Sequence, residues 1–194
     1  MSNTEVKDIL KFAHSLDYED KEYTYHKSYF YFVKYFRDKD ELTEQDLVLG
    51  ANFTYGWMPT ILNFKSREFV KSLEILNKAK SSERISTDEI LTLKSLINNS
   101  LVGVSKLLHF VNPYIYAIWD SRVCYFLLGT SRFSVIQNVD KYWEYLELCD
   151  RVIADKNFKN IHSTYESIVN YEVSPFRVVE QIMFINSDTT IAKF

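Results

Sequence analysis

Apolar residues recur every three or four positions along most of this chain, the spacing of helices that bury one face. Apolar stripes of this kind predict helices over residues 5–16, 68–80, 87–97, 140–154 and 175–185. Thr43, followed three positions later by Asp46, matches a capping box and predicts the start of a further helix. The pattern therefore indicates a mainly α fold with about ten helices.

Two stretches are harder to assign. Residues 27–36 are apolar on most sides and predict a buried helix; short strands are the alternative, because aromatic and β-branched residues favour sheets. Residues 55–59 predict a turn that leads into a helix starting at residues 60–62. The low counts of glycine (4) and proline (3) oppose a loop-rich or all-β fold, because turns need these residues.

The length of 194 residues suits a single domain over residues 1–194. Two helical lobes that share a cleft are the alternative. One lobe would then hold residues 1–80 and the C-terminal helix, and the other would hold residues 84–170 with the candidate chemistry.

Composition narrows the class of protein. The apolar fraction is 46% and the charged fraction 25%, as in an ordinary globular protein. No apolar run approaches the roughly 20 residues of a membrane span, and the first residues lack a signal-peptide pattern, so we expect a cytoplasmic protein. Cys124 and Cys149 fall in apolar helical patterns and are expected to be buried thiols. Without a cysteine cluster, neither a metal site nor another cofactor is expected.

Charge and aromatic content bear on the partner. A net charge of −3 does not favour nucleic-acid binding, because phosphate contacts dominate that affinity, although net charge can hide a local basic patch. The aromatic fraction of 16% is high and predicts many buried rings or a stacking surface. The motifs described below nevertheless predict that DNA or a modified nucleoside is the partner. A protein partner is the alternative, and no membrane association is expected.

The candidate chemistry begins around Gly103. A glycine at residues 101–104 predicts a tight turn between two helices, whose backbone N–H groups could face a phosphate. Lys106 would then lie in the first turn of the following helix. That position, together with partial burial, would disfavour the ammonium form. An amine of this kind can attack the C1′ atom of a sugar and form a Schiff base.

Asp120 is the second candidate. Pro113 stops the helix that carries Lys106, the chain then runs extended, and Asp120 takes the N-cap position of a helix over residues 121–128. A carboxylate held there could stabilise an oxocarbenium-like charge or help to activate Lys106. From spacing alone, purely structural roles for both residues are favoured, because short motifs carry a high rate of false positives.

The residues around this pair resemble the helix-hairpin-helix DNA glycosylase superfamily, in particular its 8-oxoguanine DNA glycosylase branch. Ser105-Lys106 matches the Thr-Lys that ends the family's hairpin motif, and residues 117–120 match its aspartate segment. The resemblance covers residues 91–128. The family's hairpin has a proline and two glycines, whereas this chain has the single Gly103, one position out of register when the lysines are aligned.

The resemblance implies a multi-helix fold with a central cleft. It also implies that Lys106 is the nucleophile, that Asp120 is its acidic partner, and that Gly103 and Ser105 contact the DNA backbone. The same runs look like those of small bacterial proteins with a glycosylase-like fold, some of which are associated with anti-phage defence.

Five further residues are candidates for substrate binding. His109 shares the helix face of Lys106, although a histidine between apolar neighbours is more often a hydrogen-bonded core residue. Arg122 could hold a phosphate or pair with an acidic side chain. Tyr55, Trp57 and Trp119 could form stacking walls for a flipped base, with core packing as the alternative.

Two main functional hypotheses follow from these residues. The first is an enzyme, a DNA glycosylase or glycosylase/AP lyase that removes a modified base, with a role in DNA repair or anti-phage defence. The second is a non-catalytic module with a glycosylase-like fold that binds nucleic acid or a protein partner. A purely structural helical domain is the third possibility.

Overall fold

The computed structural model describes residues 6–16, 23–58, 60–81 and 83–187. Within these residues the regular structure is helical, apart from an isolated antiparallel bridge between Phe64 and Ile97; turns and irregular segments connect the helices. The mainly α class predicted from the sequence is therefore confirmed. None of the helices in these ranges is both long enough and apolar enough to cross a lipid bilayer.

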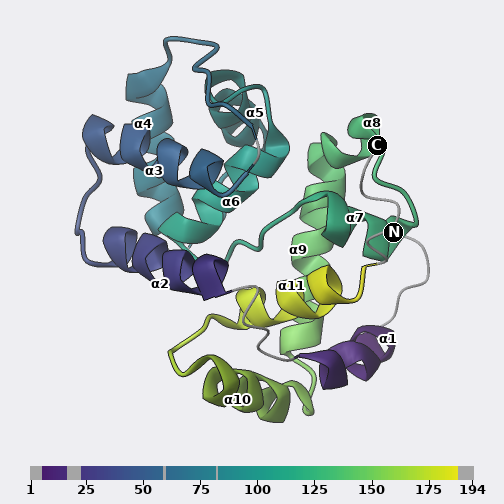
Figure 1. Cartoon of the computed structure of the whole chain (residues 1–194). Coiled ribbons are helices and arrows are strands. Elements are labelled where there is room, and N and C mark those ends of the chain that lie inside the picture. Colours follow the sequence, from purple (N-terminus) through teal and green to yellow (C-terminus); the bar gives the residue numbers. More distant parts are fainter. Residues whose placement is uncertain (1–5, 17–22, 59, 82, 188–194) are drawn as a thin grey trace. The chain divides into compact units, whose positions relative to one another are not determined.

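The chain divides into two compact units, each described by itself below (Figure 1). Unit 1 combines Met1–Glu22 with Ala117–Phe194, and unit 2 consists of Tyr23–Tyr116. The lobe boundary expected near residues 80–84 falls inside unit 2. The chain passes from unit 2 to unit 1 between Tyr116 and Ala117, within the stretch that carries the candidate chemistry.

Unit 2 is built around its last helix, which contacts the other four helices of the unit. In chain order these helices are α2 (Tyr23–Arg37), α3 (Glu44–Gly56), α4 (Phe69–Lys80), α5 (Thr87–Leu96) and α6 (Leu101–Val111). Nine of the 11 residues of α6 are buried, so this helix is the core of the unit. The mostly apolar sequence of α6 explains this position, because a helix that is apolar on most sides is surrounded by other helices.

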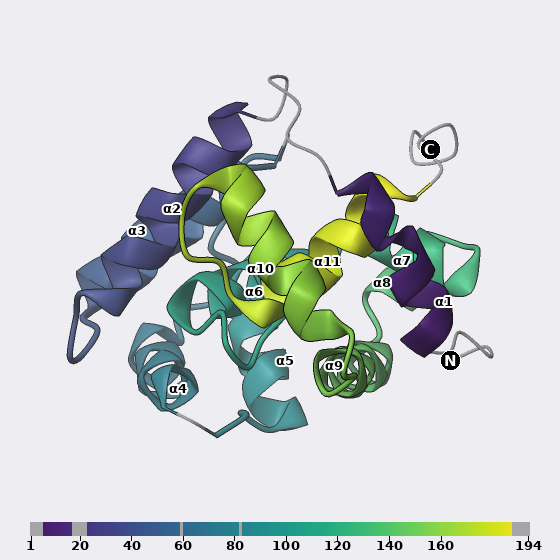
Figure 2. The same ribbon diagram turned by 90° about the horizontal axis from the view of Figure 1, so that it is seen from below.

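Unit 1 is organised around its C-terminal helix. Its elements are α1 (Val6–Lys11), the short 3-10 helix η1 (Phe12–Ser15), α7 (Ser121–Leu128), α8 (Phe133–Ile136), α9 (Val139–Ile153), α10 (Phe158–Val169) and α11 (Pro175–Ile185). Helix α11 contacts α7, α9, α10, α1 and η1, and Figure 2 shows it between α10 and α1. Ser174 caps α11 by accepting a hydrogen bond from the backbone N–H of Arg177, and Pro175 occupies the first helical position.

Two predictions from local sequence patterns, a helix start at Thr43 and a helix over residues 27–36, are confirmed. The backbone N–H of Thr43 donates to the Asp46 carboxylate at 2.8 Å, as the predicted capping box requires. The Thr43 hydroxyl donates to the same carboxylate at 2.8 Å. Residues 27–36 form part of the helix α2, so the strand alternative is wrong. Tyr29 and Phe36, seven positions apart, are buried on one side of α2 and supply the apolar face of a helix.

The helix expected at residues 60–62 is wrong. Helix α3 continues to Gly56, and the chain then runs without regular structure to the bridge at Phe64; Pro59 lies outside the described residues. The backbone N–H of Lys65 donates to the carbonyl oxygen of Leu96 at 2.9 Å. This segment is therefore held by hydrogen bonds to the end of α5 instead of by a helix of its own.

Candidate functional site

The turn between α5 and α6 lies earlier in the chain than predicted. It occupies residues 97–100, where Asn98 and Asn99 have positive φ values of 52° and 53°. Asparagine adopts this left-handed conformation more readily than most residues. The Ser100 side chain then caps α6 by accepting a hydrogen bond from the backbone N–H of Gly103 at 3.1 Å. The turn expected at residues 101–104 is therefore wrong, and Lys106 lies in the second turn of α6.

Gly103 instead permits close packing between two helices. A Cβ atom at this position would lie 2.7 Å from the hydroxyl oxygen of Tyr55 and 3.1 Å from the nearest carbon of its ring. The absence of a side chain lets the Tyr55 ring, which belongs to α3, lie directly against α6. Tyr55 is only 5% exposed, and burial raises the pKa of its hydroxyl.

Lys106 lies on the accessible side of α6. Of the 11 residues of this helix, all of them described, only Val102 and Lys106 are not buried, and their separation of four positions places them on one face. The neighbouring Ser105 is completely buried, and its hydroxyl donates to the carbonyl oxygen of Val102 at 3.0 Å. Ser105 therefore faces the interior of unit 2, whereas Lys106 reaches its surface.

His109 is buried inside unit 2 and makes hydrogen bonds with both of its ring nitrogens. Its Nδ1 atom lies 2.6 Å from the carbonyl oxygen of Tyr116, and its Nε2 atom lies 3.0 Å from the hydroxyl of Tyr29. Because a carbonyl oxygen can only accept, Nδ1 carries the proton, and in the neutral ring Nε2 accepts from Tyr29. Trp57 is half-buried nearby, stacked on Tyr29 and in edge contact with Phe110. These residues tie α2, α3 and α6 together.

Asn112 is a structural residue that the sequence interpretation missed. Its side-chain amide donates to three carbonyl oxygens at the C-terminal end of α4, those of Ala79, Lys80 and Ser81, at 3.2, 3.3 and 2.8 Å. The last carbonyl groups of a helix have no hydrogen-bond partner within it, so the Asn112 amide supplies the donors that these carbonyl oxygens of α4 lack. An asparagine directly before a proline was the available signal, but the acceptors lie more than thirty positions earlier in the chain.

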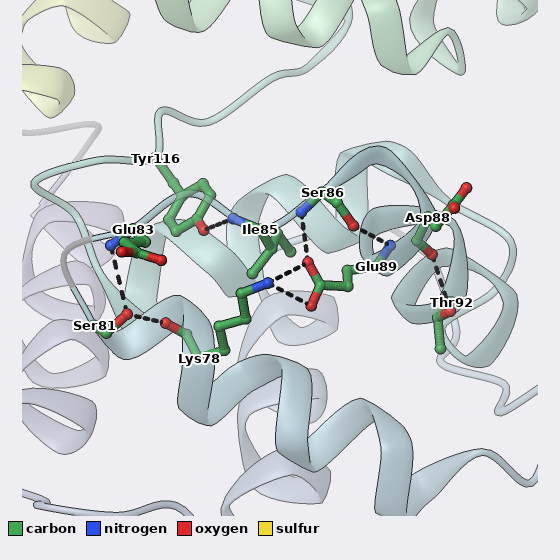
Figure 3. Close-up of polar contacts among 9 residues, drawn as sticks. All are labelled: Lys78, Ser81, Glu83, Ile85, Ser86, Asp88, Glu89, Thr92 and Tyr116. Carbon is green, nitrogen blue, oxygen red and sulfur yellow. Dashed lines mark hydrogen bonds and ion pairs between the residues drawn. The ribbon is translucent and has the colours of Figure 1, made fainter.

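Tyr116 completes the attachment of this segment to the α4–α5 connection. Its hydroxyl accepts a hydrogen bond from the backbone N–H of Ile85 at 2.9 Å (Figure 3). Burial raises the pKa of Tyr116 to about 12. In the same view, Lys78 of α4 forms an ion pair with Glu89 of α5 at 2.8 Å, and Glu89 also accepts from the backbone N–H of Ser86. Residues 109–116 are thus fixed within unit 2 at several points.

Asp120 caps α7 in unit 1, as predicted. Its Oδ1 atom accepts hydrogen bonds from the backbone N–H groups of Arg122 and Val123, both at 3.0 Å, and the residue is 9% exposed. The Arg122 guanidinium lies 4.4 Å from the centre of the Phe184 ring. Burial, followed by the charge of Asp120, raises the pKa of the Cys124 thiol to about 11.

The residues before Asp120 are held from α9. The hydroxyl of Tyr142 donates to the carbonyl oxygen of Ala117 at 3.2 Å, and that of Tyr145 donates to the carbonyl oxygen of Ile118 at 3.1 Å. Trp119 is completely buried, and its Nε1–H donates to the carbonyl oxygen of Ile136 at 2.8 Å. The two tyrosines were not singled out in the sequence, although their spacing of three predicts a shared helix face.

The structure groups the predicted site residues within each unit. In unit 2, Tyr55 meets Gly103, while Trp57 and His109 share Tyr29 as a neighbour. In unit 1, Trp119, Asp120 and Arg122 are consecutive or nearly so at the start of α7. Lys106 belongs to unit 2 and Asp120 to unit 1.

The described residues contain no group of three or more histidine, cysteine or carboxylate side chains that could hold a metal ion. Both cysteines are buried and free, as expected.

Comparisons with known proteins add no relative. The chain matched no protein family, no curated protein sequence and no solved structure.

Proposed function

We propose that the chain is a DNA glycosylase or glycosylase/AP lyase in which Lys106 is the nucleophile and Asp120 its acidic partner. The Lys106 amine attacks C1′ of a modified nucleotide, and the bond from C1′ to the base breaks. The base leaves with the electron pair of that bond and takes up a proton, and the attacking amine gives up one proton. The bond from C1′ to O4′ then breaks as the nitrogen lone pair forms the C1′=N double bond of the Schiff base, and O4′ takes up a proton as the sugar ring opens. Hydrolysis of the Schiff base, directly or after strand cleavage by elimination, releases the enzyme.

The fixed position of the Asp120 carboxylate is the observation that carries this proposal. Two backbone N–H groups hold Oδ1 at the start of α7, so the carboxylate is placed before any substrate arrives. A preorganised negative charge of this kind stabilises positive charge that develops at a sugar in the transition state. A residue needed only as a cap could equally be serine, threonine or asparagine.

The position of Lys106 supports the other half of the proposal. The lysine lies on the accessible face of a helix whose remaining residues are nearly all buried. Lys106 is only partly buried, so part of its side chain is accessible from outside the helix. The resemblance of residues 91–128 to the glycosylase superfamily supplies a chemical reason for a lysine at this position.

Trapping with borohydride tests the nucleophile. The protein is incubated with duplexes that contain 8-oxoguanine, other modified bases or an abasic site, and borohydride then reduces any Schiff base to a stable covalent adduct. We expect an adduct with the wild type and with Lys71→Gln, which changes an exposed lysine of α4, and none with Lys106→Gln. Equal trapping by Lys106→Gln would show that Lys106 is not the nucleophile.

The variant Asp120→Asn separates the proposed catalytic role of the Asp120 charge from the role of Asp120 as a helix cap. Asparagine and aspartate are equally good N-caps, so this variant keeps the hydrogen bonds to α7 and removes only the charge. We expect wild-type thermal stability and a rate of adduct formation reduced about 100-fold, the usual effect of removing one electrostatic group from an active site. An unchanged rate would leave Asp120 as a cap alone.

One observation favours the second candidate function, a non-catalytic binding module. The backbone N–H of Asn98 donates to the carbonyl oxygen of Asn63 at 3.2 Å, and its side-chain amide donates to the carbonyl oxygen of Ile61 at 2.8 Å. Donors used inside the protein are not available to phosphate, so this turn argues against a DNA contact here and favours a protein partner. Weak DNA affinity at low salt, without base release from any substrate, would support a protein-binding module against the enzyme.

A further inference from the structure

Helix α2 concentrates positive charge in a protein that is negative overall. Its sequence, Tyr23–Arg37, contains Lys27, Lys34 and Arg37 and no aspartate or glutamate, whereas the whole chain carries a net charge of −3. A local basic surface of this kind attracts polyanions even when the net charge does not.

The exposed face of α2 combines this charge with an aromatic ring. Lys27, Tyr31 and Lys34 follow one another at spacings of four and three, so they share one face of the helix. Tyr31 is 54% exposed, and the Nζ atom of Lys27 lies 5.8 Å from the centre of its ring. The two lysines are about 10 Å apart along the helix axis at 1.5 Å per residue.

Neighbouring side chains hold this face in place. The ring of Phe30 lies in edge contact with that of Tyr31, with the centroids 5.3 Å apart. Asp38, directly after the helix, pairs with Lys34 at 2.7 Å and with Arg37 at 3.7 Å. This carboxylate orients the two cations, and it also offsets part of the charge that they offer to a ligand.

We propose that this exposed face of α2 binds a single-stranded stretch of DNA, with one base stacked on Tyr31 and adjacent phosphates bound by Lys27 and Lys34. The inference extends the proposed function, on which it rests, by assigning a strand-binding surface to a helix other than α6 and α7. A single strand fits because an exposed ring needs an unpaired base, and every base offers a face for stacking.

The other polyanionic surface that basic helices bind is a membrane. A membrane-bound helix buries its apolar face in lipid. The apolar face of α2 is already covered inside unit 2, where Tyr29 and Phe36 are buried. What remains exposed is cationic and aromatic, which matches a nucleic-acid strand better than a lipid surface.

Fluorescence anisotropy with a labelled oligo(dT) strand tests the surface in the full chain. Lys27→Gln and Lys34→Gln should each weaken binding and lower the slope of log K against log salt by about 0.7, the value for one phosphate contact on a single strand. Tyr31→Ala should weaken binding about tenfold, whereas Tyr31→Phe keeps the ring and should bind like wild type.

Two further variants make the test independent of folding defects. Asp38→Asn removes the carboxylate that offsets Lys34 and Arg37, so it should bind oligo(dT) about twofold to threefold more tightly, in line with the strength of exposed ion pairs. Lys159→Gln, at an exposed position of α10, should leave binding unchanged. Opposite effects from neighbouring positions of one surface cannot come from general destabilisation.

The binding and trapping experiments together test the α2 surface and the proposed enzyme activity separately. Unchanged affinity in all α2 variants would overturn this inference, as would binding to phosphatidylserine vesicles that depends on the same residues in place of oligo(dT). Because oligo(dT) contains no modified base, its binding does not depend on Lys106. Binding through α2 without any trapped adduct would remove the proposed enzyme activity alone, and a trapped adduct without binding through α2 would remove this inference alone.

Discussion

The two units hold the stretch of residues 109–120 through different combinations of groups. In unit 2 three side chains of the stretch, those of His109, Asn112 and Tyr116, bond to other parts of the unit. In unit 1 the carbonyl oxygens of Ala117 and Ile118 accept from the tyrosines of α9, and only the side chain of Trp119 adds a bond, to the carbonyl oxygen of Ile136.

This comparison shows which residues of the stretch have a structural explanation for their identity. Burial and hydrogen bonding account for the identities of His109, Asn112 and Trp119, since each fills a position that few other side chains could fill. Backbone attachment places no such demand on Ala117 or Ile118. Several residue types could cap α7 in place of Asp120. The proposed chemistry rests on Asp120 and on Lys106, which precedes the stretch and is only partly buried.

The largest expected effect comes from Trp119→Ala. Removing a fully buried aromatic side chain costs about 3–5 kcal/mol, and the variant also leaves the carbonyl of Ile136 without its donor. Ile118→Val, next to it, should cost only about 1 kcal/mol, because its carbonyl still accepts from Tyr145. Urea unfolding monitored by circular dichroism measures both. Similar losses for the two variants would contradict the distinction between side-chain and backbone attachment.

The pH dependence of stability in Asp46→Asn tests how much the buried Asp46 carboxylate stabilises unit 2. Burial alone would raise the pKa of Asp46, but hydrogen bonds from Tyr35 and Thr43 and the ion pair with Lys39 hold it well below its ordinary value. A carboxyl with a lowered pKa in the folded state stabilises the protein above its unfolded pKa of about 3.9. That stabilisation is lost as the pH falls through the folded pKa.

The expected loss for Asp46→Asn at pH 7 is about 2 kcal/mol, the usual contribution of hydrogen bonds to a charged group. The difference between variant and wild type should shrink below about pH 4, as wild-type Asp46 begins to lose its advantage. Urea unfolding at pH 7, 5 and 3 measures the difference. A gap of the same size at all three pH values would assign the effect to packing instead of charge.

Gly103→Ala tests whether glycine serves packing or a turn. The added methyl group would press on Tyr55, with an expected cost of about 2 kcal/mol for overpacking a core. Tyr55→Phe removes the hydroxyl that the methyl group would meet at 2.7 Å, so the double variant should recover part of the loss. Additive losses in a double-mutant cycle of unfolding free energies would show that the contact is not the reason for glycine.

These variants also show what the sequence alone could predict. The capping box of Thr43 and Asp46 and the cap at Asp120 were predicted, because a cap depends on residues at most three positions away. The helices at residues 68–80, 140–154 and 175–185 were predicted from apolar periodicity, which is equally local.

The function of Gly103 could not be predicted, because it depends on Tyr55, which lies in another helix. Gly103 suggested a turn at residues 101–104, and the asparagines at residues 98–99 were assigned to the end of the preceding helix. The structure places the turn there, since Asn98 and Asn99 tolerate the left-handed conformation and Ser100 supplies the cap. Contacts between distant segments, such as Asn112 with the end of α4, leave no local pattern.

The smallest expected effect concerns Asp120, where the capping role and the chemical role separate. Asp120→Ala removes the acceptor of two backbone N–H groups and should lower the unfolding free energy by about 1 kcal/mol, whereas Asp120→Asn should leave it unchanged. Thermal or urea unfolding of both variants measures the cap. If Asp120→Asn destabilised as much as Asp120→Ala, the charge itself would support the fold, and a lower trapping rate in Asp120→Asn would no longer indicate catalysis. If Asp120→Asn were as stable as the wild type but formed no trapped adduct, the charge of Asp120 would serve the chemistry, because asparagine keeps the cap and removes only the charge.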